Sequence, residues 1–166
     1  MGKNHDVRGR RQYLLVDGYN VAHAWPDVAA MLERDLDSAA AFLASMLTAL
    51  HDPDKCEVTV VFDGKGDRVE IQRERDMALP CVIYAPIGKT ADAIIEEIIN
   101  RAPDAEAFTV ATRDNALTLS AHTCGAHVVT PDELSEWVRR EKRIVERTVL
   151  RKSRDSDSRF GNKLFD

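Results

Sequence analysis

The segment Tyr13-Leu14-Leu15-Val16-Asp17-Gly18-Tyr19-Asn20 is a short apolar run that ends abruptly at an acid, a glycine and an amide. The run is too short for a helix and does not alternate with polar residues, which is typical of a strand covered on both faces in a parallel sheet. Gly18 would then permit a turn that few other residues allow. We therefore expect a buried strand that delivers Asp17 and Asn20 to a site.

Strand-like and helix-like segments alternate along the rest of the chain. Further short apolar runs predict strands at residues 58–62, 81–84, 108–111 and 127–129. Apolar residues at helical spacing predict helices at about residues 35–50, 91–101, 115–124 and from Pro131 onward. The alternation predicts an α/β fold, a three-layer sandwich with a mostly parallel central sheet of about five strands. The charged segment 65–79 would be either an exposed amphipathic piece or a long loop.

The length of 166 residues fits one domain. We expect this domain at residues 12–152, between a flexible lead-in at residues 1–11 and a mobile tail at residues 153–166, because both ends are polar and lack a regular period. No apolar stretch approaches the roughly 20 residues needed to cross a bilayer, and the lead-in lacks the apolar core of a secretory signal. The sequence thus predicts a soluble, cytoplasmic protein without membrane association. Its three widely spaced cysteines are expected to be reduced and mostly buried.

Charge is distributed unevenly along the chain. The formal net charge of −5 argues against a generic coat for bare nucleic acid, because such proteins usually carry a basic field. Basic residues nevertheless crowd residues 139–154, where only Glu141 and Glu146 interrupt them. This basic segment would either extend a nucleic-acid track or form a solvated helix face.

Acidic residues follow several of the predicted strands. Asp17, Asp63 and Asp114 come after the first, second and fourth strands, and Asp92 lies at the start of the helix after the third. The carboxyl ends of parallel strands share one edge of a sheet, where α/β proteins bind ligands. Carboxylates gathered there would repel one another unless a cation lay between them. Oxygen ligands without histidine or thiolate favour Mg²⁺ or Mn²⁺, and such an ion can activate water for a phosphodiester displacement.

Each of these residues also has a purely structural interpretation. Asp114 could only cap a helix, Asp92 could only be a favourable first-turn charge, and Asp63 could only form a turn. Asn20 could be the amide of a tight turn, and Thr112 could be a cap or an additional oxygen near the metal. The shared position of the acids at strand ends favours a site.

Four motifs in chain order resemble the NYN domain family of PIN-like nucleases, and within it the YacP-like bacterial branch: Val16-Asp17-Gly18-Tyr19-Asn20, Phe62-Asp63, Thr90-Ala91-Asp92 and Ala111-Thr112-Arg113-Asp114. The resemblance covers about residues 13–152. It implies a PIN-like parallel sheet and a metal-dependent endoribonuclease. The acidic residues of the family map onto Asp17, Asp92 and Asp114, with Asp63 and Asn20 beside them. The basic N-terminal residues and the segment after Ser153 depart from the family pattern.

The resulting hypothesis is hydrolysis of RNA phosphodiester bonds, with Mg²⁺ or Mn²⁺ bound by Asp17, Asp92 and Asp114. Asp63 would act as a further acid behind this site or at a second metal. Asn20 and Thr112 would orient water or phosphate. Lys89 and Arg113 would neutralise the negative charge of the substrate backbone. RNA is the expected substrate, and the ribosome is a candidate partner that delivers it.

Two other functions fit part of the same pattern. A non-catalytic RNA- or ribosome-binding module of the same fold would use the acids structurally. A receiver-type phosphate-transfer domain also has acids at strand ends, but it needs a second acid beside Asp17 and a lysine after the last strand. Here Thr130-Pro131 follows Val129, so the receiver type fits poorly.

Overall fold

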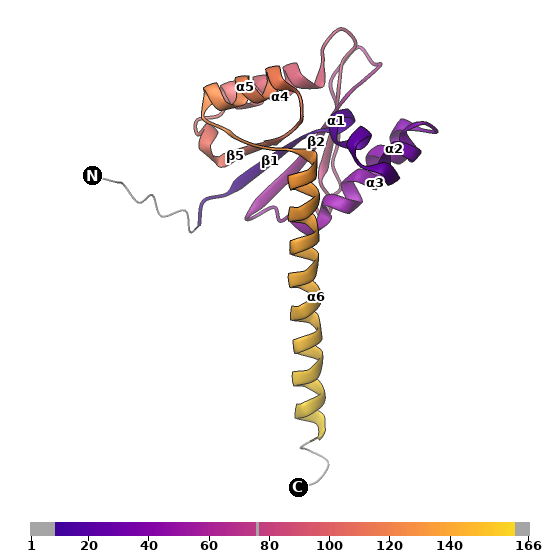
Figure 1. Ribbon diagram of the computed structural model, residues 1–166, viewed down its shortest axis with the longest axis vertical. Helices are drawn as coiled ribbons and strands as arrows, with labels where there is room; N and C mark the ends of the chain where they lie inside the picture. Colours follow the sequence, from indigo (N-terminus) through magenta and orange to yellow (C-terminus); the bar gives the residue numbers. More distant parts are fainter. Residues whose placement is uncertain (1–8, 76, 162–166) are drawn as a thin grey trace, which may run out of the picture.

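A mixed β-sheet of six strands forms the centre of the protein (Figure 1). The computed structural model describes residues 9–75 and 77–161. The strand order is β3-β4-β2-β1-β5-β6, and neighbours run parallel except at β3, which pairs with β4 in the antiparallel direction. The strands are β1 (Gln12–Asp17), β2 (Cys56–Asp63), β3 (Glu70–Gln72), β4 (Cys81–Ala85), β5 (Phe108–Ala111) and β6 (His127–Val129).

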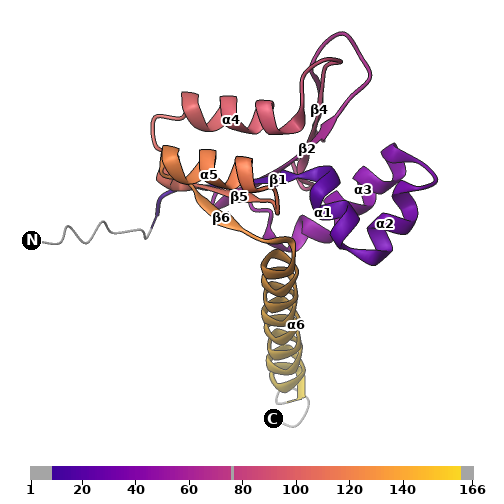
Figure 2. The ribbon, with the colours of Figure 1, turned by 45° about the horizontal axis from the view of Figure 1, so that its top comes forward.

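Helices cover both faces of the sheet, which gives the three predicted layers (Figure 2). One face is covered by α4 (Ala91–Arg101) and α5 (Asn115–Cys124). The other face is covered by α1 (Gly18–Ala24), α2 (Pro26–Leu32), α3 (Leu36–Leu47) and the first turns of α6 (Pro131–Gly161). Two short 3₁₀ turns, η1 (Thr48–Leu50) and η2 (Ala105–Ala107), precede β2 and β5.

Alternate residues of β1 face opposite helical layers, as the pleat of a strand requires. Leu14 and Val16 pack in the core shared with α1, α3 and α6, whereas Leu15 packs in the core under α4 and α5. Both faces of β1 are therefore buried, which explains its uninterrupted apolar run. Asp17 lies two residues after Leu15 and so belongs to the side of the sheet that carries α4 and α5.

The order of the strands reverses beside β1. The chain leaves β1 to form β2 and β4 on one side, then returns to form β5 and β6 on the other. In open α/β sheets such a reversal marks the place where ligands bind, outside the carboxyl ends of the strands. Asp17 ends β1 at this place, and Thr112 directly follows β5.

The fold class and the five predicted strands are confirmed, and one further strand, β3, lies within the segment 65–79 that the sequence left undecided. All three residues of β3 are exposed, so the strand has no apolar signature. It exists because it pairs with β4 at the edge of the sheet. Edge pairing of this kind depends on a distant partner, which local sequence patterns do not show.

The residues after β1 differ from the prediction. Gly18 begins α1 instead of forming a turn, and a Cβ at this position would lie 2.7 Å from the ring of Phe62. Glycine is therefore needed for close packing of α1 on β2. Two short helices, α1 and α2, occupy the stretch on either side of Trp25, and the indole Nε1 donates a hydrogen bond to the backbone oxygen of Pro131 at 3.0 Å. This bond ties the first helices to the start of α6.

The structure describes part of each predicted end of the domain. Helix α6 continues to Gly161, so the predicted irregular tail from Ser153 is helical as far as that residue. Residues 162–166 of the tail and residues 1–8 of the lead-in lie outside the described part of the chain. At the end of the lead-in, Arg10 forms an ion pair with Asp104 and Arg11 forms one with Glu57. These two residues of the predicted flexible segment thus contact the domain.

Two further predictions concern the cysteines and membrane association. The three cysteines are free thiols, of which Cys81 is buried and Cys56 and Cys124 are partly exposed. Within residues 9–75 and 77–161, none of the helices is long and apolar enough to cross a membrane.

Candidate active site

Backbone register brings Asp17 and Thr112 together at the carboxyl edge of the sheet. Val16 lies opposite Ala111 in the parallel ladder of β1 and β5, so the next residue of each chain segment is also adjacent. The side chain of Thr112 is 1% exposed, and its hydroxyl donates a hydrogen bond to Oδ2 of Asp17 at 3.0 Å. The buried carboxyl group is thereby fixed in orientation by a buried hydroxyl.

The same hydroxyl also organises the start of α5. Thr112 Oγ1 accepts a hydrogen bond from the backbone N–H of Asp114 at 3.1 Å. Asp114 then caps α5, because its Oδ1 accepts the backbone N–H of Leu117 at 2.7 Å. One carboxylate oxygen of Asp114 is therefore used by the helix, and the structural role considered for this residue is real. Its other oxygen forms no hydrogen bond with a described residue.

Asn20 connects α1 to the loop after β5. Its side-chain oxygen accepts the backbone N–H of Arg113 at 2.6 Å. Asn20 is thus a brace between the two segments that flank the reversal of strand order. The structure thus brings Asn20, a predicted site residue, close to Asp17 and Thr112. Its side-chain amide holds the loop after β5 in place at this edge.

Asp63 and Thr90 position the first turn of α4. Oδ1 of Asp63, at the end of β2, accepts the backbone N–H of Ala91 at 2.6 Å. The hydroxyl of Thr90 accepts the backbone N–H of Ala93 at 3.1 Å, as the sequence predicts for a helix cap. These bonds anchor the turn that carries Asp92, whose side chain faces Asp17.

The electrostatics show how closely the acids approach one another. Burial, followed by the charge of Asp92, raises the pKa of Asp17 from 3.8 to about 7, although the bond from Thr112 works in the opposite direction. Burial and the charge of Asp114 likewise raise the pKa of Asp92, with smaller effects of Asp63 and Glu96. Hydrogen bonding between the two carboxyl groups favours a protonated Asp17 beside an ionised Asp92. The edge is thus a set of acids held together against their repulsion.

The donor set at this edge suits a hard divalent cation. It consists of carboxylate oxygens without thiolate or imidazole, which is the chemistry that Mg²⁺ and Mn²⁺ prefer. Burial and the neighbouring acids raise the pKa values of Asp17 and Asp92, so the edge favours the uptake of positive charge, as protons or as a cation. No three His, Cys, Asp or Glu side chains of the described residues are already arranged to enclose an ion. An ion held by Asp17, Asp92 and Asp114 would therefore require these side chains to rearrange.

Comparison with known proteins identifies the family. The family model of the YacP-like NYN domain matches residues 14–166. The chain belongs to the YacP-like NYN family. NYN domains are part of the PIN-like nuclease superfamily, so the chain carries a nuclease-type domain.

Solved structures agree with this family assignment. A point mutant of Rae1 (YacP) from Bacillus subtilis is 29% identical, with a TM-score of 0.68 over 86% of this chain and 83% of that chain. Another crystal structure of Rae1 (YacP) from Bacillus subtilis is 26% identical, with a TM-score of 0.71 over 89% of this chain and 84% of that chain. No curated protein matches the chain.

The two cations predicted to bind substrate flank the acids of this NYN domain, but both have partners. Lys89 Nζ lies 2.5 Å from a carboxylate oxygen of Glu97. The guanidinium group of Arg113 lies 3.7 Å from Asp132, at the start of α6, and both side chains are largely exposed. Because the contact of Arg113 is longer and more exposed than that of Lys89, the guanidinium group of Arg113 is the more accessible to a substrate.

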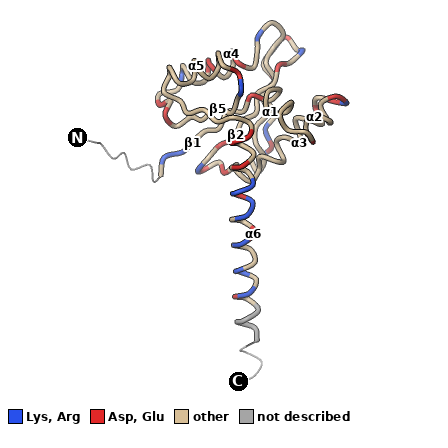
Figure 3. Tube along the Cα trace, in the orientation of Figure 1, with Lys and Arg blue, Asp and Glu red and all other residues tan. Residues whose placement is uncertain are grey.

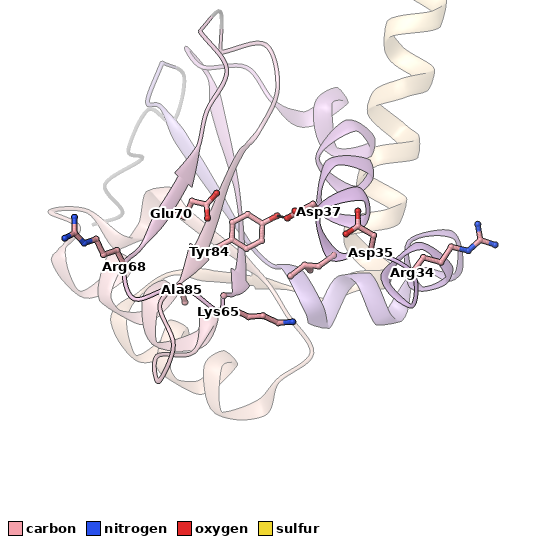
Figure 4. Close-up of a pocket in the computed structure, with 11 residues that line it drawn as sticks. Arg34, Asp35, Asp37, Lys65, Arg68, Glu70, Tyr84 and Ala85 are labelled. Atoms are coloured by element: carbon pink, nitrogen blue, oxygen red, sulfur yellow. Dashed lines mark hydrogen bonds between the residues drawn. The ribbon is translucent and has the colours of Figure 1, made fainter.

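A hollow that the sequence did not reveal lies beside the acidic edge of the NYN domain (Figure 4). It has a volume of about 470 Å³ and lies between the start of α3, the loop after β2, β3 and β4. The Tyr84 hydroxyl at its centre donates a hydrogen bond to Asp37 at 3.1 Å. Arg34 and Arg68 point away from the hollow, whereas Lys65 reaches across it. At one side of the hollow the backbone at Gly64 packs closely on β4, since a Cβ there would lie 2.3 Å from the backbone oxygen of Ala85.

Proposed function

We propose that this protein is a metal-dependent endoribonuclease that hydrolyses RNA phosphodiester bonds at the carboxyl edge of its sheet. The observation that carries the proposal is the burial of Asp17 beside Asp92, which raises the pKa of Asp17 to about 7. Two carboxyl groups placed so close in a buried position destabilise the fold when both are ionised, and a divalent cation between them would offset that cost. The nuclease-type family supports the same function.

Asp17, Asp92 and Asp114 are the residues that would hold Mg²⁺ or Mn²⁺. When bound, such an ion stabilises the charge that develops on a phosphate and lowers the pKa of water. The remaining groups of the chain fix the donors in place. Thr112 orients the carboxyl group of Asp17, and Asp63 anchors the turn that carries Asp92.

Substrate contacts are proposed for the groups around the acids. Asn20 holds the loop that carries Arg113, and the exposed guanidinium group of Arg113 can exchange Asp132 for a phosphate. Lys89 would similarly leave Glu97 for the substrate backbone. We propose RNA as the substrate on the family resemblance, and the ribosome as the partner that brings RNA to a chain of net charge −5.

A cleavage assay with matched variants tests this function. Asp17→Asn should reduce Mn²⁺-dependent cleavage of single-stranded RNA on the order of 100-fold or more, because it removes a charged ligand. Asp54→Asn, at an exposed position before β2 and so at the opposite edge of the sheet, is the matched control and should cleave normally. The same assay with EDTA should show no cleavage by the unaltered protein. Full activity of Asp17→Asn would exclude Asp17 from the chemistry.

The structural roles of Asp63 and Asp114 favour a second candidate function. Both accept backbone N–H groups at helix starts, as they would in a non-catalytic RNA- or ribosome-binding module of the same fold. Calorimetric titration with Mn²⁺ distinguishes the two functions. A binding isotherm that Asp92→Ala weakens supports the nuclease. Absence of binding by the unaltered protein, together with retained RNA affinity, supports the module.

A further inference from the structure

Helix α6 carries a stripe of arginines that the rest of the described chain leaves unpaired. Arg140, Arg143, Arg147, Arg151 and Arg154 follow one another at spacings of three or four residues, so they share one face of the helix. All five are exposed, and none forms an ion pair with a residue whose side chain the structure describes, at positions 9–75 and 77–156. We name these five residues the arginine stripe.

The stripe concentrates positive charge in an otherwise acidic protein. Residues 139–154 contain eight basic and two acidic residues, whereas the whole chain has a formal net charge of −5. Figure 3 shows the blue basic residues following one another along α6, away from the sheet. Unpaired like charges on one helix face repel one another and weaken the helix, so this arrangement has a cost in the free protein. A polyanion bound along the face would remove that cost.

The stripe lies far from the acidic edge of the sheet. Helix α6 begins after β6, at the carboxyl edge where Arg113 contacts Asp132, and then passes η1 at the opposite edge. At 1.5 Å per residue, Arg143 lies about 16 Å and Arg154 about 33 Å along the helix from Asp132. In Figure 1 the second half of α6 extends away from the body of the molecule. A ligand that contacts both the acids and the stripe must therefore be long.

We propose that the arginine stripe binds the phosphate backbone of RNA at a distance from the acidic edge, so that α6 anchors a long RNA. The proposal rests on the proposed function in that RNA is the ligand of the acidic edge. Arginine is suited to this role because its planar guanidinium group binds phosphate in a bidentate manner. With one phosphate per 3.4 Å of stacked strand, an RNA needs on the order of ten nucleotides to span both regions.

The matched test compares two triple variants of α6 that remove the same charge. The stripe variant carries Arg143→Gln, Arg147→Gln and Arg151→Gln. The control variant carries Arg139→Gln, Lys142→Gln and Lys152→Gln, which lie on other faces of the same helix. Glutamine keeps a high helix propensity, and circular dichroism verifies that α6 is retained in both.

Affinity for a single-stranded 30-nucleotide RNA is measured in the Asp17→Asn background, where binding is separated from cleavage. The stripe variant should bind at least 10-fold more weakly than the control variant, and the slope of log affinity against log salt should fall by about 2. The loss should be much smaller for a 5-nucleotide RNA, whose stacked length of about 17 Å from the acidic edge reaches no farther than Arg143. Equal affinity of the two triple variants for the 30-nucleotide RNA overturns the proposal and would leave the stripe to an acidic protein partner. If affinity depends on the stripe but the protein that keeps Asp17 shows no cleavage, the proposed nuclease is overturned and the anchor is kept.

Discussion

At the scale of single residues, the position of Asp17 determines how stability should depend on pH. The pKa of this carboxyl group rises from 3.8 to about 7 on folding, because of burial and the charge of Asp92. The folded protein therefore holds the proton more tightly than the unfolded chain. The resulting stabilisation is fully present below about pH 4 and is lost as the pH rises through 7. A protein without bound metal should thus become less stable between these values.

Asp17→Asn should remove this loss, because the amide cannot ionise and its oxygen can still accept the bond from Thr112. At pH 8 with EDTA we expect the variant to be more stable by on the order of 2 kcal/mol, or about 4–8 °C in Tm, while at pH 4 the difference should be small. Thermal melts across this pH range measure the effect. The Asp54→Asn control should follow the unaltered protein, and a lower Tm of Asp17→Asn at pH 8 would contradict the assigned burial cost.

The hydroxyl of Thr112 should matter more when Asp17 is ionised. Thr112→Val keeps the shape of the side chain but removes the donor to Asp17 and the acceptor of the Asp114 N–H. We expect a loss of about 1–3 kcal/mol, larger at pH 8 than at pH 5, because the hydroxyl lowers the pKa of Asp17. Urea unfolding at the two pH values measures this difference. Thr112→Ser keeps the hydroxyl and should lose stability equally at both, so an equal loss in the valine variant would contradict the role.

At the scale of elements, the packing at the start of α1 depends on Gly18, which has no Cβ. A Cβ at Gly18 would lie 2.7 Å from the ring of Phe62 on β2, so Gly18→Ala should destabilise the protein by about 1–3 kcal/mol. The cause can be isolated with Phe62→Leu, which removes the ring that the new methyl group would meet. In a double-mutant cycle, the two changes together should cost less than the sum of their separate effects. Additive costs would show that the clash is not the cause.

The sequence predicted some elements closely, and particular residues explain why. Helix α4 matches its predicted range because Thr90 caps it and isoleucines at helical spacing bury one face. Helix α5 ends where Gly125 adopts the left-handed conformation at φ 92°. In contrast, the sequence did not predict α1 and α2. Trp25-Pro26 separates them into two short helices, and neither is long enough to show a repeating pattern of apolar residues. The polar second half of α6 lacks a buried face, so its composition suggested an irregular tail.

The candidate site was predictable as a set of acids but not as a network. Strand ends place Asp17, Asp63 and Asp114 at one edge whatever the strand order, and the structure confirms this arrangement. The hydrogen-bond partners of these acids could not be predicted, because they depend on which strands are neighbours. That Thr112 binds Asp17 follows from the pairing of β1 with β5. That Asp63 binds Ala91 follows from the packing of α4 beside β2, which no local pattern shows.

At the scale of the whole molecule, the domain and the second half of α6 should behave as two regions of different stability. Leu134 and Val138 are buried in the core, and up to residue 156 Glu141 is the last residue of α6 that is partly covered. Residues 142–156 are exposed on every face, including the apolar side chains of Val145 and Val149. Most of the stability of a helix comes from tertiary packing, and an isolated helix of this length is marginal in water.

Hydrogen exchange should therefore separate the two regions in the free protein. Backbone amides of residues 145–156 should exchange close to the rate of a marginal helix, whereas those of α4 should be protected up to the stability of the whole domain. Truncation after Arg143 should leave the Tm of the domain within about 2 °C, because no described core contact is removed. Addition of a long RNA should slow exchange in residues 145–156 if the arginine stripe is occupied. Strong protection of this region in free, monomeric protein, or a large fall in Tm on truncation, would mean that α6 packs on the domain in solution.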